Sequence, residues 1–152
     1  MFSKYDRLTW RGYRFNRRTV RMLKWAERRS GVPIRIAQGS FNKGGVAASA
    51  GTHDGSSVDI KVVHLSKSQR VALIHALKDA GFAAWVRKPP AFGWHIHAIP
   101  TGDAQVSSAA AVQVRSYDRH RDGLAGDRRD PTYRPSPKRG YSFLRNRPVT
   151  RK

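Results

Sequence analysis

The feature that most constrains this chain is a strand of alternating character near its middle. Over residues 57–63, Val58, Ile60 and Val62 would share one face, while Asp59 would project from the other. Such a pattern is typical of a strand with one face on an apolar core and the other in polar surroundings. The fold therefore needs a sheet that buries one side and leaves a carboxylate on the opposite side.

Helical periodicity and further short apolar runs predict the rest of the secondary structure. Gly31 and Gly81 are suited to end helices, and Ser66 with Gln69 fits a capping box at a helix start. Residues 40–52 are rich in small side chains and predict a loop. The predicted helices span residues 14–30, 66–80 and 107–120, and the further strands span residues 33–39, 82–87 and 92–99.

Length and composition limit the chemistry that is possible. The 152 residues suit one domain with a single core, and they include no cysteine. Disulfides, thiolate metal sites and cysteine nucleophiles are therefore excluded, so a metal would need His and carboxylate ligands. No apolar run approaches the ~18 residues of a transmembrane helix. Residues 1–7 are not followed by an apolar stretch, which predicts that no signal peptide is present.

The whole chain has a net charge of +20, and the positive charge is concentrated at its two ends. Residues 1–30 carry ten Lys or Arg against two acidic residues, and residues 115–152 carry twelve against four. Such ends would attract a polyanion, whether nucleic acid, an anionic membrane or a phosphate-bearing cell-wall polymer. Residues 122–152 are rich in Pro and Arg and poor in apolar side chains. We therefore predict a domain over residues 1–121, followed by an extended basic arm.

Two of the six histidines lie two residues apart on a predicted strand. His95 and His97 would project from the same face of that strand, opposite its apolar residues. Asp59 has the equivalent position on its own strand, and His53 precedes it across a glycine-containing turn. If the strands are neighbours, His53, Asp59 and His97 converge as an N, O, N donor set. Zinc binds three such ligands at catalytic sites and keeps a fourth position open, so we predict one zinc site.

Two segments carry a resemblance to a known family. The segments at residues 49–60 (SAGTHDGSSVDI) and 93–97 (GWHIH) resemble the LAS-type zinc metallopeptidases. These are D-Ala-D-Ala carboxypeptidases, endopeptidases and endolysins that share their fold with the hedgehog signalling domain. The resemblance covers about residues 13–102 and looks like an actinobacterial or actinophage branch. It implies an α+β fold, with a small four-stranded antiparallel sheet flanked by helices, and the zinc ligands His53, Asp59 and His97.

Three departures from the family pattern affect the expected chemistry. His53 and Asp59 are one residue closer in sequence than the first two ligands of the family usually are. Trp94 stands where the family often has a general-base Glu, and residues 39–42 (GSFN) replace the Gly-aromatic-Arg element that often anchors a substrate carboxylate. We therefore expect His95 to be the acid/base group, because it shares the strand face of the last ligand. Gln38 or Ser40 would help to hold the peptide.

The resemblance implies a zinc-dependent peptidase that cleaves D-amino-acid-containing stem peptides or cross-links of peptidoglycan. The basic ends would hold it on an anionic wall polymer. One alternative is a phage virion or other structural protein, in contact with other virion proteins, that keeps the fold without turnover; the missing Glu and Arg favour it. The other is a nucleic-acid-binding protein, which rests on charge alone. The C-terminal segments at residues 117–124 (YDRHRDGL) and 134–137 (RPSP) also look phage-like. This resemblance implies a bacteriophage protein that is in the virion, in the host cytoplasm before lysis, or at the bacterial cell wall.

Overall fold

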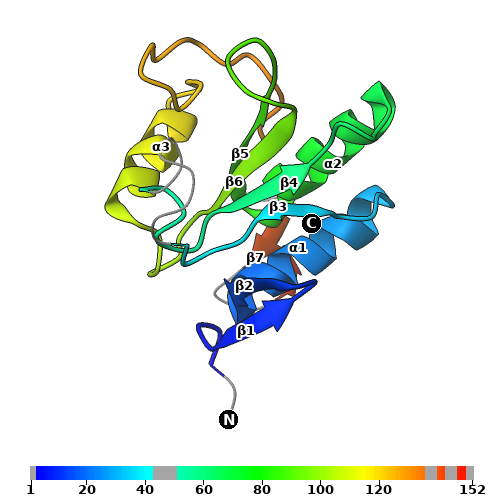
Figure 1. The fold of residues 1–152 in the computed structure, drawn as a ribbon, viewed down its shortest axis with the longest axis vertical. Helices are drawn as coiled ribbons and strands as arrows, with labels where there is room; N and C mark the ends of the chain where they lie inside the picture. Colours follow the sequence, from blue (N-terminus) through cyan, green and yellow to red (C-terminus); the bar gives the residue numbers. More distant parts are fainter. Residues whose placement is uncertain (1–2, 43–50, 136–139, 143–146, 150–152) are drawn as a thin grey trace.

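The computed structural model describes residues 3–42, 51–135, 140–142 and 147–149. Within these ranges the chain forms an α+β fold around a four-stranded antiparallel sheet (Figure 1), which confirms the predicted class. The elements in chain order are β1 (Arg7–Trp10), β2 (Tyr13–Asn16), α1 (Arg17–Ser30), β3 (Ile36–Gln38), β4 (Val58–Lys61), α2 (Lys67–Ala80), β5 (Phe82–Arg87), β6 (His95–Pro100), α3 (Ser108–Asp118), β7 (Gly140–Ser142) and β8 (Arg147–Val149).

Helix α1 begins three residues later than its periodicity predicts. Asn16 precedes the helix in an extended conformation, and its side-chain oxygen accepts a hydrogen bond of 2.8 Å from the backbone N–H of Thr19. This N-cap satisfies a backbone group that has no partner within the helix. The helix ends as predicted, because Gly31 adopts the left-handed conformation that favours glycine.

A hairpin of β1 and β2 precedes this helix, and the sequence pattern does not predict it. Its turn consists of Arg11 and Gly12, which both have positive φ. Two such residues are what the type I′ turn requires, and this turn matches the twist of paired strands. The Arg11 guanidinium donates hydrogen bonds to the carboxylate of Glu27 and to the carbonyl of Ile34. The hairpin is thereby tied to α1 and to the chain that enters β3.

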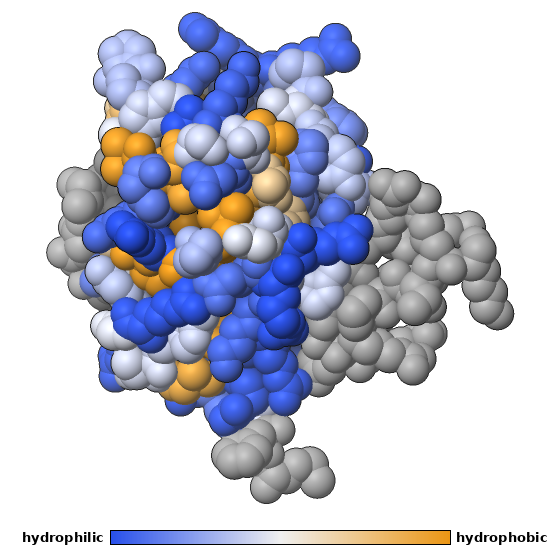
Figure 2. Space-filling view, turned by 90° about the vertical axis from the view of Figure 1, so that its right-hand side faces the viewer, coloured by the Kyte–Doolittle hydropathy of each residue, from blue (hydrophilic) through white to orange (hydrophobic). Residues whose placement is uncertain are grey.

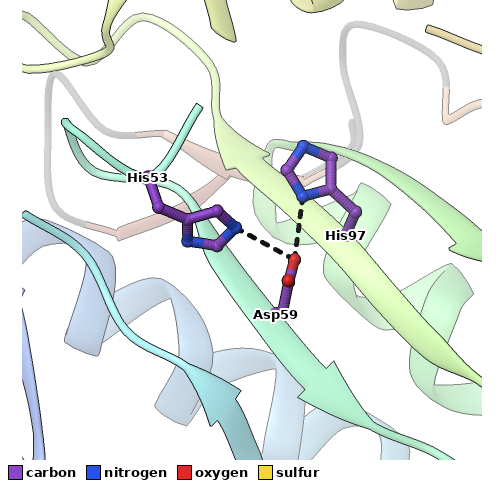
Figure 3. A group of neighbouring side chains, drawn as sticks. All are labelled: His53, Asp59 and His97. Carbon is purple, nitrogen blue, oxygen red and sulfur yellow. Dashed lines mark hydrogen bonds and ion pairs between the residues drawn. The ribbon is translucent and has the colours of Figure 1, made fainter. Parts of the chain in front are cut away.

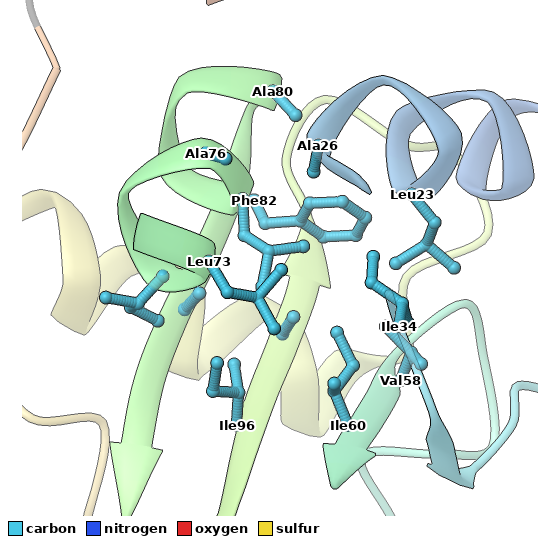
Figure 4. Packing of buried hydrophobic residues seen from close by; sticks show 14 of the residues in the cluster. Leu23, Ala26, Ile34, Val58, Ile60, Leu73, Ala76, Ala80, Phe82 and Ile96 are labelled. Carbon is cyan, nitrogen blue, oxygen red and sulfur yellow. The ribbon is translucent and has the colours of Figure 1, made fainter. Parts of the chain in front are cut away.

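The central sheet has the strand order β3-β4-β6-β5, and helices α1 and α2 cover one of its faces. Figure 4 shows the apolar side chains of both helices meeting those of the strands. The predicted half-buried strand is confirmed as β4, whose Val58 and Ile60 are fully buried in this core. Helix α2 has the predicted capping box of Ser66 and Gln69, and it ends at Gly81.

Helix α3 lies on the other side of the sheet (Figure 1). A second, smaller apolar cluster joins Ala83, Trp85 and Ile99 of the strands to Ala110 and Tyr117 of the helix. Successive residues of a strand point to opposite faces. The polar residues that alternate with the core positions of β4 and β6 are therefore gathered on the side of α3.

The segment that follows α3 packs against the domain as far as residue 134, which corrects the prediction of an unpacked arm over this stretch. Three buried donors bind its carbonyl groups: Trp85 Nε1 to Arg121 (2.9 Å), Arg87 Nη1 to Asp122 (2.7 Å) and Lys78 Nζ to Tyr133 (2.8 Å). Buried donors need acceptors, and the backbone of this segment supplies them. The composition of the segment shows only its own shortage of apolar residues, so it does not reveal these partners.

Beyond this segment, β7 and β8 pair as an antiparallel hairpin. The rest of the predicted arm and most of the predicted loop over residues 40–52 lie outside the described residues. Among the described residues, no helix has both the length and the apolar character needed to cross a membrane.

Candidate metal centre

Three side chains meet on the α3 side of the sheet, as the sequence predicts (Figure 3). His53 comes from the turn that precedes β4, Asp59 from β4 itself and His97 from β6. Asp59 and His97 are directly opposite each other in the antiparallel pairing of these strands. Directly paired residues project from the same face of a sheet. The register therefore places the carboxylate and the imidazole side by side.

The three candidate ligand atoms lie within 4.8 Å of one another. Oδ1 of Asp59 is 3.1 Å from Nε2 of His53 and 2.8 Å from Nδ1 of His97. His53 has no exposed surface, and the other two residues are also buried. Nε2 of His53 makes no well-aligned hydrogen bond in spite of this short distance. The arrangement is thus a compact, buried N, O, N donor set.

The outer nitrogen of each histidine faces an oxygen acceptor. Nδ1 of His53 lies 3.0 Å from the carbonyl oxygen of Gly39, and Nε2 of His97 lies 2.8 Å from Oε1 of Gln113. The amide nitrogen of Gln113 donates to the carbonyl of Gly123 (3.3 Å), which fixes which end of the amide faces His97. A carbonyl oxygen only accepts hydrogen bonds, so both outer ring nitrogens must carry a proton.

This proton assignment tests whether the site fits a cation. A neutral imidazole with its outer nitrogen protonated directs the lone pair of its inner nitrogen at the Asp59 carboxylate. Without a cation, the rings would either face the carboxylate with these lone pairs or each need a second proton, with their centres 5.5 Å apart in a buried site. A divalent metal among the three atoms removes this conflict. Outer hydrogen bonds of the same kind orient the histidine ligands of known metal sites, so His53, Asp59 and His97 fit a metal ion.

The surroundings also keep Asp59 in its ionised form. Burial alone would raise the pKa of this carboxyl group. When the two rings donate N–H groups to it, as they would without a metal, His53 and His97 outweigh burial and hold the pKa well below its usual range. An ionised carboxylate is the form that binds a metal, so the group is ready to act as a ligand at neutral pH.

The short sequence interval between His53 and Asp59 is accommodated by a tightly packed turn. The backbone N–H of Asn42 donates to the carbonyl of His53 (2.7 Å), and that of Ser56 donates to the carbonyl of Gln105 (3.2 Å). Gly55 lies so close to the chain before α3 that a Cβ atom there would be 2.2 Å from the Gln105 carbonyl oxygen. Only glycine fits this position, and the close contact folds His53 back toward the carboxylate.

His95 is on the same face of β6 as His97 but is not one of the three grouped ligands. It is partly exposed, and its Nδ1 lies 2.8 Å from the carbonyl oxygen of Gly93. That contact makes Nδ1 the protonated nitrogen and leaves Nε2 as the proton acceptor. Its position is compatible with the predicted acid/base role, which stays a prediction.

Gln38 reaches the face of the metal site through an irregularity in the sheet. Ile36 is paired with Ile60 in the core, but the register then shifts, so Gln38 is opposite Asp59. A regular ladder would place Gln38 on the core face instead. A bulge of this kind re-aims a side chain, and here it leaves Gln38 beside the ligands, compatible with its predicted contact to a peptide.

Ser40 has a structural position, which corrects its predicted role in binding a substrate. Its side chain is only 2% exposed, and its hydroxyl donates to the carbonyl of Ser57 (3.0 Å). Its backbone N–H donates to the carbonyl of Arg14 in the N-terminal hairpin (2.9 Å). The hydroxyl and the backbone N–H of Ser40 therefore join parts of the fold.

Two residues that contact His97 are missing from the sequence-based site. Gln113 of α3 accepts its outer proton, and the ring of Trp85 stacks on the imidazole at 6.2 Å between centroids. The spacing of Gln113 offers a signal, because it lies on the helix face of Ala110 and Tyr117, which pack on the sheet. A polar residue within an apolar stripe indicates a buried partner.

The described residues thus bring together three ligands, an outer hydrogen-bond acceptor for each histidine and His95 on the same strand face. This arrangement could hold one metal ion with a proton acceptor on the same side of the sheet. No protein-family model matches the sequence, and neither a curated protein nor a solved structure matches it.

Proposed function

We propose that this chain is a zinc-dependent peptidase of the LAS type, with a hedgehog/DD-peptidase-like fold. Its substrates would be the D-amino-acid-containing stem peptides or cross-links of peptidoglycan. The observation that carries the proposal is the buried group of His53, Asp59 and His97, with its outer nitrogens already bonded. The resemblance of residues 49–60 and 93–97 supports the choice of zinc and of peptidoglycan.

His53, Asp59 and His97 would hold the metal, and His95 would do the proton transfer. Zinc with three protein ligands supplies Lewis acidity and activates water at neutral pH. Nε2 of His95 accepts a proton from the attacking water and passes it to the leaving amine. Gln38, opposite Asp59 in the sheet, offers an amide to the backbone of the bound peptide. Trp85 stacks on His97 and, together with α3, keeps bulk water from that ligand.

A phage virion protein that keeps the metal but has no turnover is the second candidate. The position where the family often has its general-base Glu holds Trp94, which packs against the main core. The Arg70 guanidinium lies over its ring, 4.5 Å from the centroid. Trp94 thus has a structural role, and the whole catalytic function would depend on His95.

The decisive experiment combines metal analysis with a hydrolysis assay on one purified sample of the full chain. Zinc content is measured by mass spectrometry, and release of D-alanine or soluble fragments is measured on purified peptidoglycan. His95→Ala should keep zinc and lose roughly 10²–10⁴-fold in rate, whereas Asp59→Asn should lose zinc. His64→Ala is the matched control, because His64 is exposed and outside the site.

The outcomes separate the candidates. Zinc with hydrolysis that depends on His95 supports the peptidase. Zinc without hydrolysis would favour the virion protein. The absence of both zinc and hydrolysis would favour the nucleic-acid-binding protein, which rests on charge alone. Loss of zinc in His95→Ala would make His95 a ligand and overturn the assigned set.

A further inference from the structure

A groove of about 680 Å³ lies between α2, strand β5 and the segment that follows α3. Apolar side chains such as Val71 and Ile74 form part of its lining, and charged residues form much of the rest. Figure 2 shows the side of the molecule that is on the right in Figure 1. Hydrophilic residues divide the apolar surface there. The groove uses none of the three candidate metal ligands.

Positive charge dominates the lining of this groove. The two acidic residues among its lining side chains already have partners. Asp130 pairs with Arg134 at 3.0 Å, and Asp122 accepts a hydrogen bond from the backbone of Leu124. The groove therefore has an excess of cations that its own carboxylates do not neutralise. The basic side chains that line it are Lys67, Arg70, His75, Lys78, Arg87, Lys88 and Arg129.

Arg87 is the most informative of these basic residues. Its side chain is only 6% exposed, and no carboxylate of the described residues lies within ion-pair distance of it. Its Nη1 donates to the carbonyl of Asp122, but its buried Nη2 has no acceptor in the described part of the chain. A buried charged donor without an acceptor is costly. An oxyanion that enters the groove beside Arg87 would supply the missing acceptor.

The aromatic groups of the groove are already stacked on neighbours. Trp85 stacks on His97, His75 stacks on Tyr133, and Trp94 has the Arg70 guanidinium over its ring. Binding of single-stranded nucleic acid usually needs open aromatic faces on which bases can stack. The groove therefore favours an anion without bases, and cations on both of its walls suit a ligand with repeated charges.

We propose that this groove binds a phosphodiester polymer without bases, such as a polyol phosphate, with one phosphate held by Arg87. Lys67 and Arg70 on α2 and Lys88 after β5 contact neighbouring phosphates. Nη2 of Arg87 donates to a phosphate oxygen while Nη1 keeps its hydrogen bond to Asp122, and the guanidinium charge strengthens the new bond. The proposal does not depend on hydrolysis at the metal centre, because the groove does not contain its ligands.

The test measures binding of a short fluorescein-labelled glycerol phosphate oligomer to the full chain by fluorescence anisotropy. A single-stranded DNA with the same number of phosphates is the second probe. Arg87→Gln should weaken binding of the glycerol phosphate at least about tenfold, and Lys88→Gln about two- to fivefold. Arg29→Gln is the matched control, because Arg29 is exposed on α1, outside the groove, and the charge change is the same.

Three results would overturn the proposal. One is an equal loss of affinity in Arg87→Gln and Arg29→Gln, which would indicate diffuse attraction to a basic surface. Another is tighter binding of the DNA than of the glycerol phosphate, which would assign the groove to nucleic acid. The third is an unchanged affinity in Lys88→Gln, which decides the matter if Arg87→Gln does not fold. A loss confined to the groove variants, with DNA bound more weakly, supports it.

Discussion

The hydrogen bond from His97 to Gln113 makes a sharp prediction about metal affinity. Nε2 of His97 lies 2.8 Å from the Gln113 side-chain oxygen, and this contact directs the other ring nitrogen at Asp59. Gln113→Leu keeps a side chain of similar size on α3 but removes the acceptor. We expect this variant to fold and to bind zinc more weakly, although Gln113 touches none of the metal-facing atoms.

The magnitude follows from the burial of the ring. His97 is buried, so in the leucine variant its Nε2–H loses an acceptor where water does not readily replace it, at a cost of about 1–3 kcal/mol. Loss of the hydrogen-bond partner of a histidine ligand typically weakens metal binding by ~10–100-fold, or about 1.4–2.7 kcal/mol. The two values agree. Gln113→Glu keeps an acceptor at this point, so its affinity should stay within about threefold of wild type.

Competition with a chromophoric chelator at neutral pH measures the zinc dissociation constant of each variant. Thermal unfolding gives an independent measure, because zinc at 100 times its dissociation constant adds about 2.7 kcal/mol to the stability. A variant with tenfold weaker affinity would gain only about 1.4 kcal/mol at the same zinc concentration. If Gln113→Leu is folded and its affinity is unchanged, the outer hydrogen bond does not orient His97. Equal weakening in Gln113→Glu would point to disturbed packing of α3 instead.

Two further predictions concern the turn before β4 and the start of the C-terminal segment. Gly55→Ala places a methyl group against the Gln105 carbonyl, so urea unfolding should show a free energy of unfolding that is lower by about 1–3 kcal/mol. Zinc binding should also weaken, because His53 moves. Unchanged stability and zinc affinity would contradict the packing of this turn. Burial lowers the pKa of Lys78 to about 8 from ~10.4 in the unfolded chain. Because its pKa is lower in the folded state, Lys78 contributes most to stability above its unfolded pKa. This contribution is lost as the pH falls through 8. The unfolding free energy should therefore rise between pH 8 and 10 by ~2 kcal/mol relative to Lys78→Met, and a flat difference would refute this.

The sequence predicts the centre of the metal site well, because alternation fixes which residues share a face. Asp59 alternates with Val58 and Ile60, and His97 alternates with apolar neighbours in the same way. Once β4 and β6 pair, the burial of their apolar faces leaves little choice of register. The carboxylate and the imidazole then share a face, and the observed register places them directly opposite each other. The same argument does not fix His53, whose approach depends on the packing of its turn.

The parts that the sequence does not predict depend on contacts between distant segments. The outer acceptor Gln113 is on α3, and only the docking of α3 on the sheet brings it to His97. The segment after α3 is bound in part through its backbone carbonyls, which are the same for every residue type. Its own composition therefore gives no sign of the buried donors, such as Lys78 and Trp85, that hold it.

Gly39 links the unpredicted N-terminal hairpin to the metal site. Its carbonyl accepts the outer proton of His53, so the position of this backbone decides the orientation of that ligand. The hairpin packs directly against the same residue: a Cβ on Gly39 would lie 2.9 Å from the Cβ of Tyr13 and 3.0 Å from the carbonyl oxygen of Arg14. The next residue, Ser40, donates its backbone N–H to that Arg14 carbonyl. The hairpin, which contributes no ligand, thus holds the backbone that orients His53, and the site needs the fold of the chain from residue 7 onward.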